Sequence, residues 1–156
     1  MRIKTFVLWV SAFVLLSGCS PKNLPEPPNI HCGKDVCDEC RMIIADKKLA
    51  AGFVDKEGNE YKFDDIGCMR LFIEKNKEIP LVFWVHDFGS EEWIDADKAF
   101  FTHSPKLMTP MGYGIAAFSN EDSAKQFLRT NGGEVVSWEK MLEMIRKTTQ
   151  FIRGGE

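Results

Sequence analysis

Two successive stretches of the chain, residues 49–86 and 98–137, show the same succession of patterns. In each, apolar residues form short strand-like runs, then recur at helical spacing, and then form another strand-like run. In the first stretch, short strand-like runs at 49–54 and 60–63 flank Lys56-Glu57-Gly58-Asn59, which predicts a β-hairpin. Apolar residues then recur at helical spacing over residues 66–75, after the candidate N-cap Asp64-Asp65. A buried strand is expected at 81–85, directly after Pro80.

The second stretch predicts the same elements in the same order. Strands are expected at 99–102 and 114–118, followed by the N-cap Ser119-Asn120 and a helix over 123–129. Asn131-Gly132-Gly133 ends this helix, and a strand is expected at 134–137. A last helix is predicted over roughly 138–151.

The two strand-to-helix junctions also align in sequence. Phe63-Asp64-Asp65 precedes Phe72 with the same spacing at which Phe118-Ser119-Asn120 precedes Phe127. This match favours a duplicated ββαβ unit, with chance similarity between two short junctions as the alternative. The predicted class is α+β, with two ββαβ units (about 49–86 and 98–137), a mainly antiparallel sheet and a C-terminal helix.

The N-terminal segment reads as a lipoprotein signal peptide over residues 1–18. Arg2 and Lys4 precede an apolar run that is too short to span a bilayer. The run ends in Leu16-Ser17-Gly18-Cys19, a lipobox in which Cys19 is acylated and becomes the new N-terminus. Two or more acyl chains would anchor the chain stably to a membrane outside the cytoplasm.

The rest of the chain divides into a tether and one domain. Four prolines and no apolar periodicity over residues 19–30 predict an extended tether, and residues 31–151 would form the domain. Without residues 1–18, 18 Lys and Arg stand against 23 Asp and Glu. This negative balance argues against nucleic acid as a partner. The sequence also lacks a Gly-rich phosphate loop and any credible catalytic acid–base set, so we expect a binding protein and not an enzyme.

Sulfur ligands are concentrated in Cys37-Asp38-Glu39-Cys40-Arg41-Met42. Two thiols at this spacing can share a metal ion or form a redox disulfide. In an extended chain the Met42 thioether lies on the same side as Cys40. Thiolates and thioethers are soft ligands that select Cu(I), although Met42 heading the run Met42-Ile43-Ile44 could equally be core.

A second candidate ligand is Met111, in Thr109-Pro110-Met111-Gly112-Tyr113-Gly114. Proline and two glycines predict a loop on which the methionine is exposed, and an incidental methionine in a turn is the alternative. Cys68 in the first helix reads as a small buried apolar residue or as a disulfide partner of Cys32 or Cys37. The three histidines read as surface or satisfied residues: His31, His86 (at a strand end, near a rim) and His103.

Taken in order, these motifs resemble the NosL family of nitrous oxide reductase accessory lipoproteins. The resemblance rests on the lipobox, Cys-x-x-Cys-x-Met-Ile-Ile, Lys-Phe-Asp-Asp-Ile-Gly-Cys-Met and Thr-Pro-Met-Gly-x-Gly-Ile-x-Ala-Phe. It implies a fold of two ββαβ units related to that of organomercurial lyase. It also implies a copper chaperone that delivers Cu(I) to apo nitrous oxide reductase together with an ABC-type membrane complex.

Carried over by position, Cys40, Met42 and Met111 become the expected Cu(I) ligands, with Cys37 in reserve. One departure is Arg41, where the family usually has glycine between the second cysteine and the methionine. Two other functions stay open. Cys37 and Cys40 could act in a thiol–disulfide oxidoreductase, or the four cysteines of the domain could hold Zn²⁺ or form disulfides that only stabilise the fold.

Overall fold

The computed structural model describes residues 25–78 and 80–153. The signal peptide, Cys19 and the first part of the predicted tether lie outside the described residues. At the described end of the tether, Pro28 is buried against Gly52 in the first strand, where a Cβ atom would lie 3.0 Å from the proline Cγ. This part of the proline-rich segment therefore lies on the domain.

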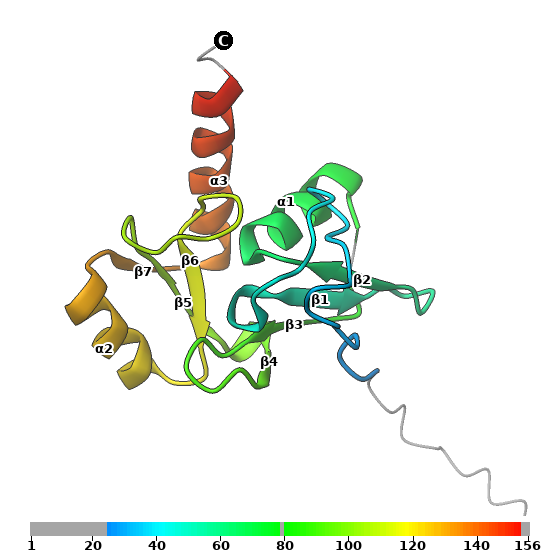
Figure 1. The fold of residues 1–156 in the computed structure, drawn as a ribbon, viewed down its shortest axis with the longest axis horizontal. Helices are drawn as coiled ribbons and strands as arrows, with labels where there is room; N and C mark the ends of the chain where they lie inside the picture. Colours follow the sequence, from blue (N-terminus) through cyan, green and yellow to red (C-terminus); the bar gives the residue numbers. More distant parts are fainter. Residues whose placement is uncertain (1–24, 79, 154–156) are drawn as a thin grey trace, which may run out of the picture.

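The first half of the domain is a four-stranded sheet with one helix (Figure 1). The strand order is β2-β1-β3-β4, and every neighbouring pair is antiparallel. In chain order the elements are a 3-10 turn η1 (Lys47–Leu49), β1 (Ala51–Val54), β2 (Glu60–Phe63), α1 (Ile66–Asn76), β3 (Val82–His86) and β4 (Trp93–Asp95).

The second half repeats this order around a three-stranded antiparallel sheet, β6-β5-β7. Its elements are η2 (Ala96–Lys98), β5 (Phe100–His103), β6 (Ile115–Phe118), α2 (Glu121–Asn131) and β7 (Glu134–Val136). The last helix, α3 (Trp138–Arg153), extends away from the two sheets, as Figure 1 shows.

The predicted α+β class, the two ββαβ units and the C-terminal helix are confirmed. Most predicted boundaries agree within two residues. Sequence analysis missed β4, because Trp93-Ile94-Asp95 is too short to show a period and is a strand only through its pairing with β3. His86 is not at a rim: it is buried, its Nδ1 lies 2.9 Å from the Ala50 carbonyl oxygen, and its ring packs on Trp93.

One large apolar core joins the two halves. Phe53, Phe63 and Met69 of the first half share this core with Ile115 of the second half and Met141 of α3. A smaller cluster around Phe118 lies under α2. The two halves are thus parts of one domain, although each has its own sheet.

A carboxylate also links the halves. Asp87, just after β3, accepts hydrogen bonds from the backbone N–H groups of Gly89 and Ser90 and, at 2.6 Å, from that of Ser119 beyond β6. Burial by itself would raise the pKa of Asp87, but the hydrogen bonds from Ser90, Ser119 and Gly89 outweigh it and lower the pKa to about 2.

No helix within residues 25–78 and 80–153 has the length and apolarity that crossing a membrane requires.

Candidate metal centre

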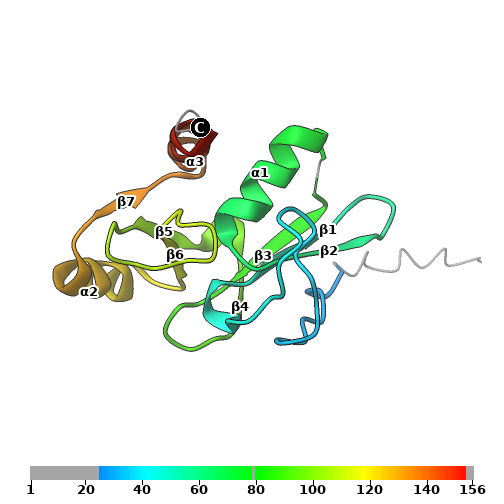
Figure 2. The same ribbon diagram turned by 45° about the horizontal axis from the view of Figure 1, so that its top comes forward.

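Residues 31–44 form a loop that covers the first half of the domain. The loop is a narrow hairpin closed by hydrogen bonds from Gly33 N–H to Ile44 O and from Cys37 N–H to Met42 O. At its tip, Asp38 N–H donates to Lys62 O, and the Asp38 carboxylate accepts from Lys62 N–H at 2.8 Å. These bonds attach the tip to β2, and Figure 2 shows the loop beside α1.

Three thiols and one carboxylate meet at this point. The ligand atoms of Cys37, Cys40, Asp64 and Cys68 all lie within 4.8 Å of one another. The loop supplies Cys37 and Cys40, the end of β2 leads directly into Asp64, and the first turn of α1 supplies Cys68. Cys37, Asp64 and Cys68 are buried, whereas Cys40 is partly exposed. We call these four residues the thiol cluster.

Hydrogen bonds and burial give the three thiols of the thiol cluster different pKa values. The Cys68 thiol donates to Cys37 and, with the N–H groups of Cys40 and Asp64, lowers the pKa of Cys37 to about 7. Burial raises the pKa of Cys40 to about 12, and its thiol donates to both Asp64 oxygens at 3.4 Å. The hydrogen bond to Cys37 and burial also raise the pKa of Cys68. Of the three thiols, Cys37 therefore loses its proton most easily, and all three lie beside the Asp64 carboxyl group.

Asp65 attaches a second loop, residues 109–114, to the same end of α1. Its carboxylate caps the helix by accepting from Gly67 N–H at 2.7 Å, and it also accepts from Thr109 and from Met111 N–H. Burial raises the pKa of Asp65 to about 6, and those hydrogen bonds offset only part of the rise. Tyr113 packs so closely on Gly67 that a Cβ atom there would lie 2.2 Å from the tyrosine ring.

The residues predicted as metal ligands lie in two kinds of environment. Cys37 and Cys40 belong to the thiol cluster. The Met42 side chain is 40% exposed on the loop, next to Ile43. Met111 is partly buried and packs against the large core, so the expectation that it is exposed is wrong; the exposed methionine of that region is Met108.

Sequence analysis missed two members of the thiol cluster. Asp64 was read with Asp65 as a helix cap, but only Asp65 caps α1. Cys68 was read as a small apolar residue, and it is indeed fully buried, yet it faces two other thiols. Cys68 lies one helical turn after Asp64, which puts both on one side of the helix start, and this spacing was the available signal. No disulfide joins the four described cysteines, which are all free thiols.

Arg41, at the position where the NosL family usually has glycine, has a backbone conformation that favours glycine. Arg41 has φ of 66°, in the left-handed region that favours glycine. Its N–H donates to Cys37 O and closes the Cys37–Cys40 turn. Its guanidinium lies 3.7 Å from the Asp38 carboxylate at the surface. Arg41 therefore keeps the turn geometry and adds a positive charge beside the thiol cluster.

Three comparisons show which known proteins this chain resembles. Residues 30–145, well over half of the chain, match the model of the NosL family. The copper-binding lipoprotein NosL of Stutzerimonas stutzeri is 27% identical over 155 residues, covering 90% of this chain and 81% of that protein. The crystal structure of the copper chaperone NosL from Shewanella denitrificans superposes with a TM-score of 0.65 at 18% identity, covering 75% of this chain and 96% of that one. The fold, the order of the motifs and the family match together show that this chain belongs to the NosL family.

Proposed function

We propose that this protein is a lipid-anchored Cu(I) chaperone that carries one ion in the thiol cluster outside the cytoplasm. The observation that carries the proposal is the meeting of Cys37, Cys40, Cys68 and Asp64 within 4.8 Å, in a chain of the NosL family. The copper-binding relative from Stutzerimonas stutzeri supports the same metal. Thiolates are soft ligands, and Cu(I) accepts two or three of them.

The environments of the sulfur atoms suggest a route for transfer. Cys37 and Cys68 are buried and would hold the ion, while the partly exposed Cys40 and the exposed Met42 would face an incoming partner. Met111 lies on the loop that Asp65 attaches to the same helix end. A thioether is a weaker ligand than a thiolate, so Met42 and Met111 are the ligands expected to exchange first.

The recipient in this proposal is apo nitrous oxide reductase, loaded together with an ABC-type membrane complex, as the family resemblance implies. Acylation of Cys19 would hold the protein at the membrane surface. Copper-loaded protein should lose its ion to apo nitrous oxide reductase of the same organism, and Cys19→Ala should move the protein from the membrane fraction to the soluble fraction.

Competition with a chromogenic Cu(I) chelator under anaerobic conditions tests the site. Cys40→Ser should weaken Cu(I) binding by about 100-fold, the share of one thiolate in a typical structural metal site. Cys32→Ser is the matched control, because Cys32 is an exposed thiol outside the cluster. Met42→Leu and Met111→Leu should weaken Cu(I) binding but leave Zn²⁺ binding unchanged. Wild-type Cu(I) affinity in Cys40→Ser would overturn the assignment.

The thiol pKa values predict how Cu(I) affinity depends on pH. Because the pKa values of Cys40 and Cys68 are raised, binding to both thiolates releases two protons near neutral pH. Each released proton lowers the apparent Cu(I) affinity about tenfold per unit fall in pH. A steep loss of affinity from pH 8 to pH 6 is therefore expected, measured by the same competition.

The oxidoreductase alternative has one observation in its favour, the low pKa of Cys37. A redox titration separates the two functions. Reversible cycling of a Cys37–Cys40 disulfide at thioredoxin-like potentials, with no tight Cu(I) binding, would favour the enzyme.

A further inference from the structure

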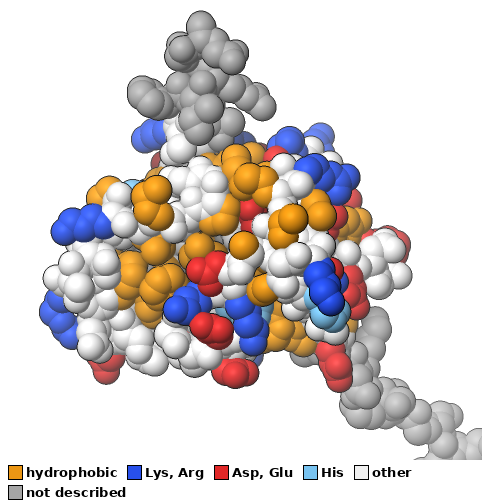
Figure 3. Space-filling model, in the orientation of Figure 1, with side chains coloured by type: hydrophobic (Ala, Val, Ile, Leu, Met, Phe, Trp, Pro, Cys, Tyr) orange, Lys and Arg blue, Asp and Glu red, His pale blue; other side chains and the backbone are white. Residues whose placement is uncertain are grey.

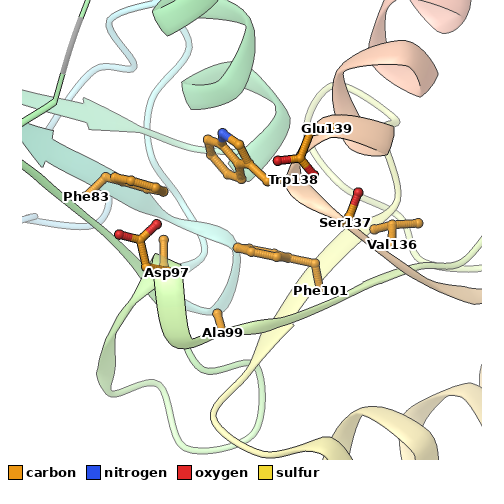
Figure 4. A pocket seen from close by; sticks show the side chains of 9 residues that line it. Phe83, Asp97, Ala99, Phe101, Val136, Ser137, Trp138 and Glu139 are labelled. Carbon is orange, nitrogen blue, oxygen red and sulfur yellow. The ribbon is translucent and has the colours of Figure 1, made fainter.

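A cavity lies where the two halves of the domain and α3 meet, and none of the residues that line it belongs to the thiol cluster. It has a volume of about 240 Å³. Phe83 of β3, Phe101 of β5 and Trp138 at the start of α3 form its walls, with Asp97, Ser137 and Glu139 beside them. Figure 4 shows the three aromatic rings turned toward one another, with the Asp97 carboxylate beside Phe83 and the Glu139 carboxylate beside Trp138.

The rings form a single aromatic surface. The centroid of Trp138 lies 5.0 Å from that of Phe83 and 5.7 Å from that of Phe101, and both pairs are tilted. All three side chains line the cavity. Aromatic faces carry negative electrostatic potential and attract cations, with Trp the strongest.

The charges in the wall have one sign. Two of the nine residues that line the cavity are carboxylates, Asp97 and Glu139, and none is Lys, Arg or His. A described cation beside the cavity is Arg70, whose guanidinium carbon lies 5.3 Å from the Trp138 ring centroid and whose Nε donates to Trp138 O. Arg70 is outside the cavity lining and pairs with Glu74. Its charge also interacts with the Glu139 carboxylate.

We propose that this cavity binds a small organic cation of the quaternary ammonium class, such as choline. Aromatic rings around a positive methylated group, with carboxylates at the edge, are the usual recognition chemistry for such ligands. The volume is below that of pockets for drug-sized ligands, which limits the ligand to a few non-hydrogen atoms. The site is independent of copper and would be a second binding function of the chain.

The test uses the full, copper-free chain in a non-ionic maltoside detergent, labelled with 5-fluorotryptophan. Fluorine NMR follows the Trp138 signal, assigned by its loss in Trp138→Phe, during titration with choline and with 3,3-dimethyl-1-butanol, its uncharged carbon analogue. We expect saturable shifts with choline and about tenfold weaker binding of the analogue. Equal responses to the two compounds, or none to choline, would overturn the proposal.

Variants identify the groups responsible. Asp97→Asn and Glu139→Gln should each weaken choline binding several-fold and reduce its salt dependence, because both side chains are exposed and the changes preserve shape. Glu57→Gln, an exposed carboxylate in the turn between β1 and β2, is the control and should bind choline as the wild type does. Unchanged binding in Asp97→Asn and Glu139→Gln would contradict the role of the carboxylates.

A cationic side chain of another protein is the competing occupant. N-acetyl-lysine methylamide, titrated in the same way, represents it. Tighter binding of this amide than of choline would overturn the assignment to a small quaternary cation.

Discussion

The two halves of the domain share one local structure but differ at the start of their helices. In each, a strand ends in phenylalanine, a polar residue caps the helix, and a second phenylalanine returns onto the first. The Phe63–Phe72 and Phe118–Phe127 ring centroids are both 5.3 Å apart. The caps are Asp65 in α1 and Asn120 in α2.

The difference begins three residues after each cap, at Cys68 in α1 and Ser123 in α2. The whole first turn of α1 is buried, because residues 31–44 and 109–114 cover it. In the first turn of α2, by contrast, the acidic Glu121 and Asp122 are exposed, whereas Ala124 is buried. A duplicated unit thus becomes a candidate metal centre only where an added loop closes over the helix start and supplies more thiols.

The surface over α1 and the loop 31–44 is partly apolar. On the face seen in Figure 3, apolar side chains emerge among Lys and Arg over α1 and the loop 31–44. Within that loop, Val36, Met42 and Ile43 are the large exposed apolar residues. Exposed apolar groups beside a metal loop suit contact with a partner protein.

The largest expected effect concerns the two matched phenylalanines. Phe63→Ala should destabilise the fold by about 3–5 kcal/mol, because Phe63 is fully buried in the large core. Phe118→Ala should cost about 1 kcal/mol less, because its cluster is small and lies closer to solvent. Urea unfolding measures both. Equal losses of unfolding free energy in the two variants would contradict the expectation that the large core contributes more to stability than the small cluster.

The matched helix positions give the next test. Cys68→Ala should weaken Cu(I) binding by about 100-fold, roughly 3 kcal/mol, since it removes one of three thiolates. Ser123→Ala, at the corresponding position of α2, should leave Cu(I) binding unchanged. Chelator competition measures both variants. Undiminished affinity in Cys68→Ala would remove the first turn of α1 from the metal centre.

The link between the halves is tested at Asp87. Asp87→Asn should lower the free energy of unfolding by about 2 kcal/mol at neutral pH, because charged acceptors form the stronger hydrogen bonds. The folded-state pKa of about 2 lies below the ordinary 3.8, so the wild type keeps this contribution above pH 4 and loses it as pH falls toward 2. Acid unfolding of Asp87→Asn should lack that part of the pH dependence; a curve parallel to wild type would contradict it.

The smallest effect concerns the turn of the metal loop. Arg41→Gly should stabilise the fold by about 0.5–1 kcal/mol, because Arg41 is held at φ of 66°. The same substitution in the second half, Arg129→Gly in α2, should destabilise by about 1 kcal/mol, as glycine does within helices. Thermal unfolding should give opposite signs. Destabilisation by Arg41→Gly would mean that its ion pair with Asp38 outweighs the backbone strain.

Part of the candidate metal centre was predictable from local sequence. The Cys37–Cys40 spacing and the following Met42 are evident along the chain, and the capped helix after Phe63 placed Cys68 correctly in a first turn. The grouping of Cys68 and Asp64 with Cys37 was not predictable. It depends on hydrogen bonds between Asp38 and Lys62, which are far apart in sequence.

The exposure of the two methionines depended on tertiary packing for the same reason. The glycines around Met111 predicted a loop, which exists, but the loop packs down because Asp65 accepts from Met111 N–H and Tyr113 contacts Gly67. Met42, which could have been core, lies on an exposed loop.

By itself the sequence determined the α+β class, the repeated ββαβ order, the helix caps and the family, because periodicity, capping and motif spacing act over a few residues. Only the tertiary structure decided which thiols meet, how their protons divide, and that Phe83, Phe101 and Trp138 enclose a cavity. Those outcomes depend on contacts between segments that lie far apart along the chain, and no local pattern specifies such contacts.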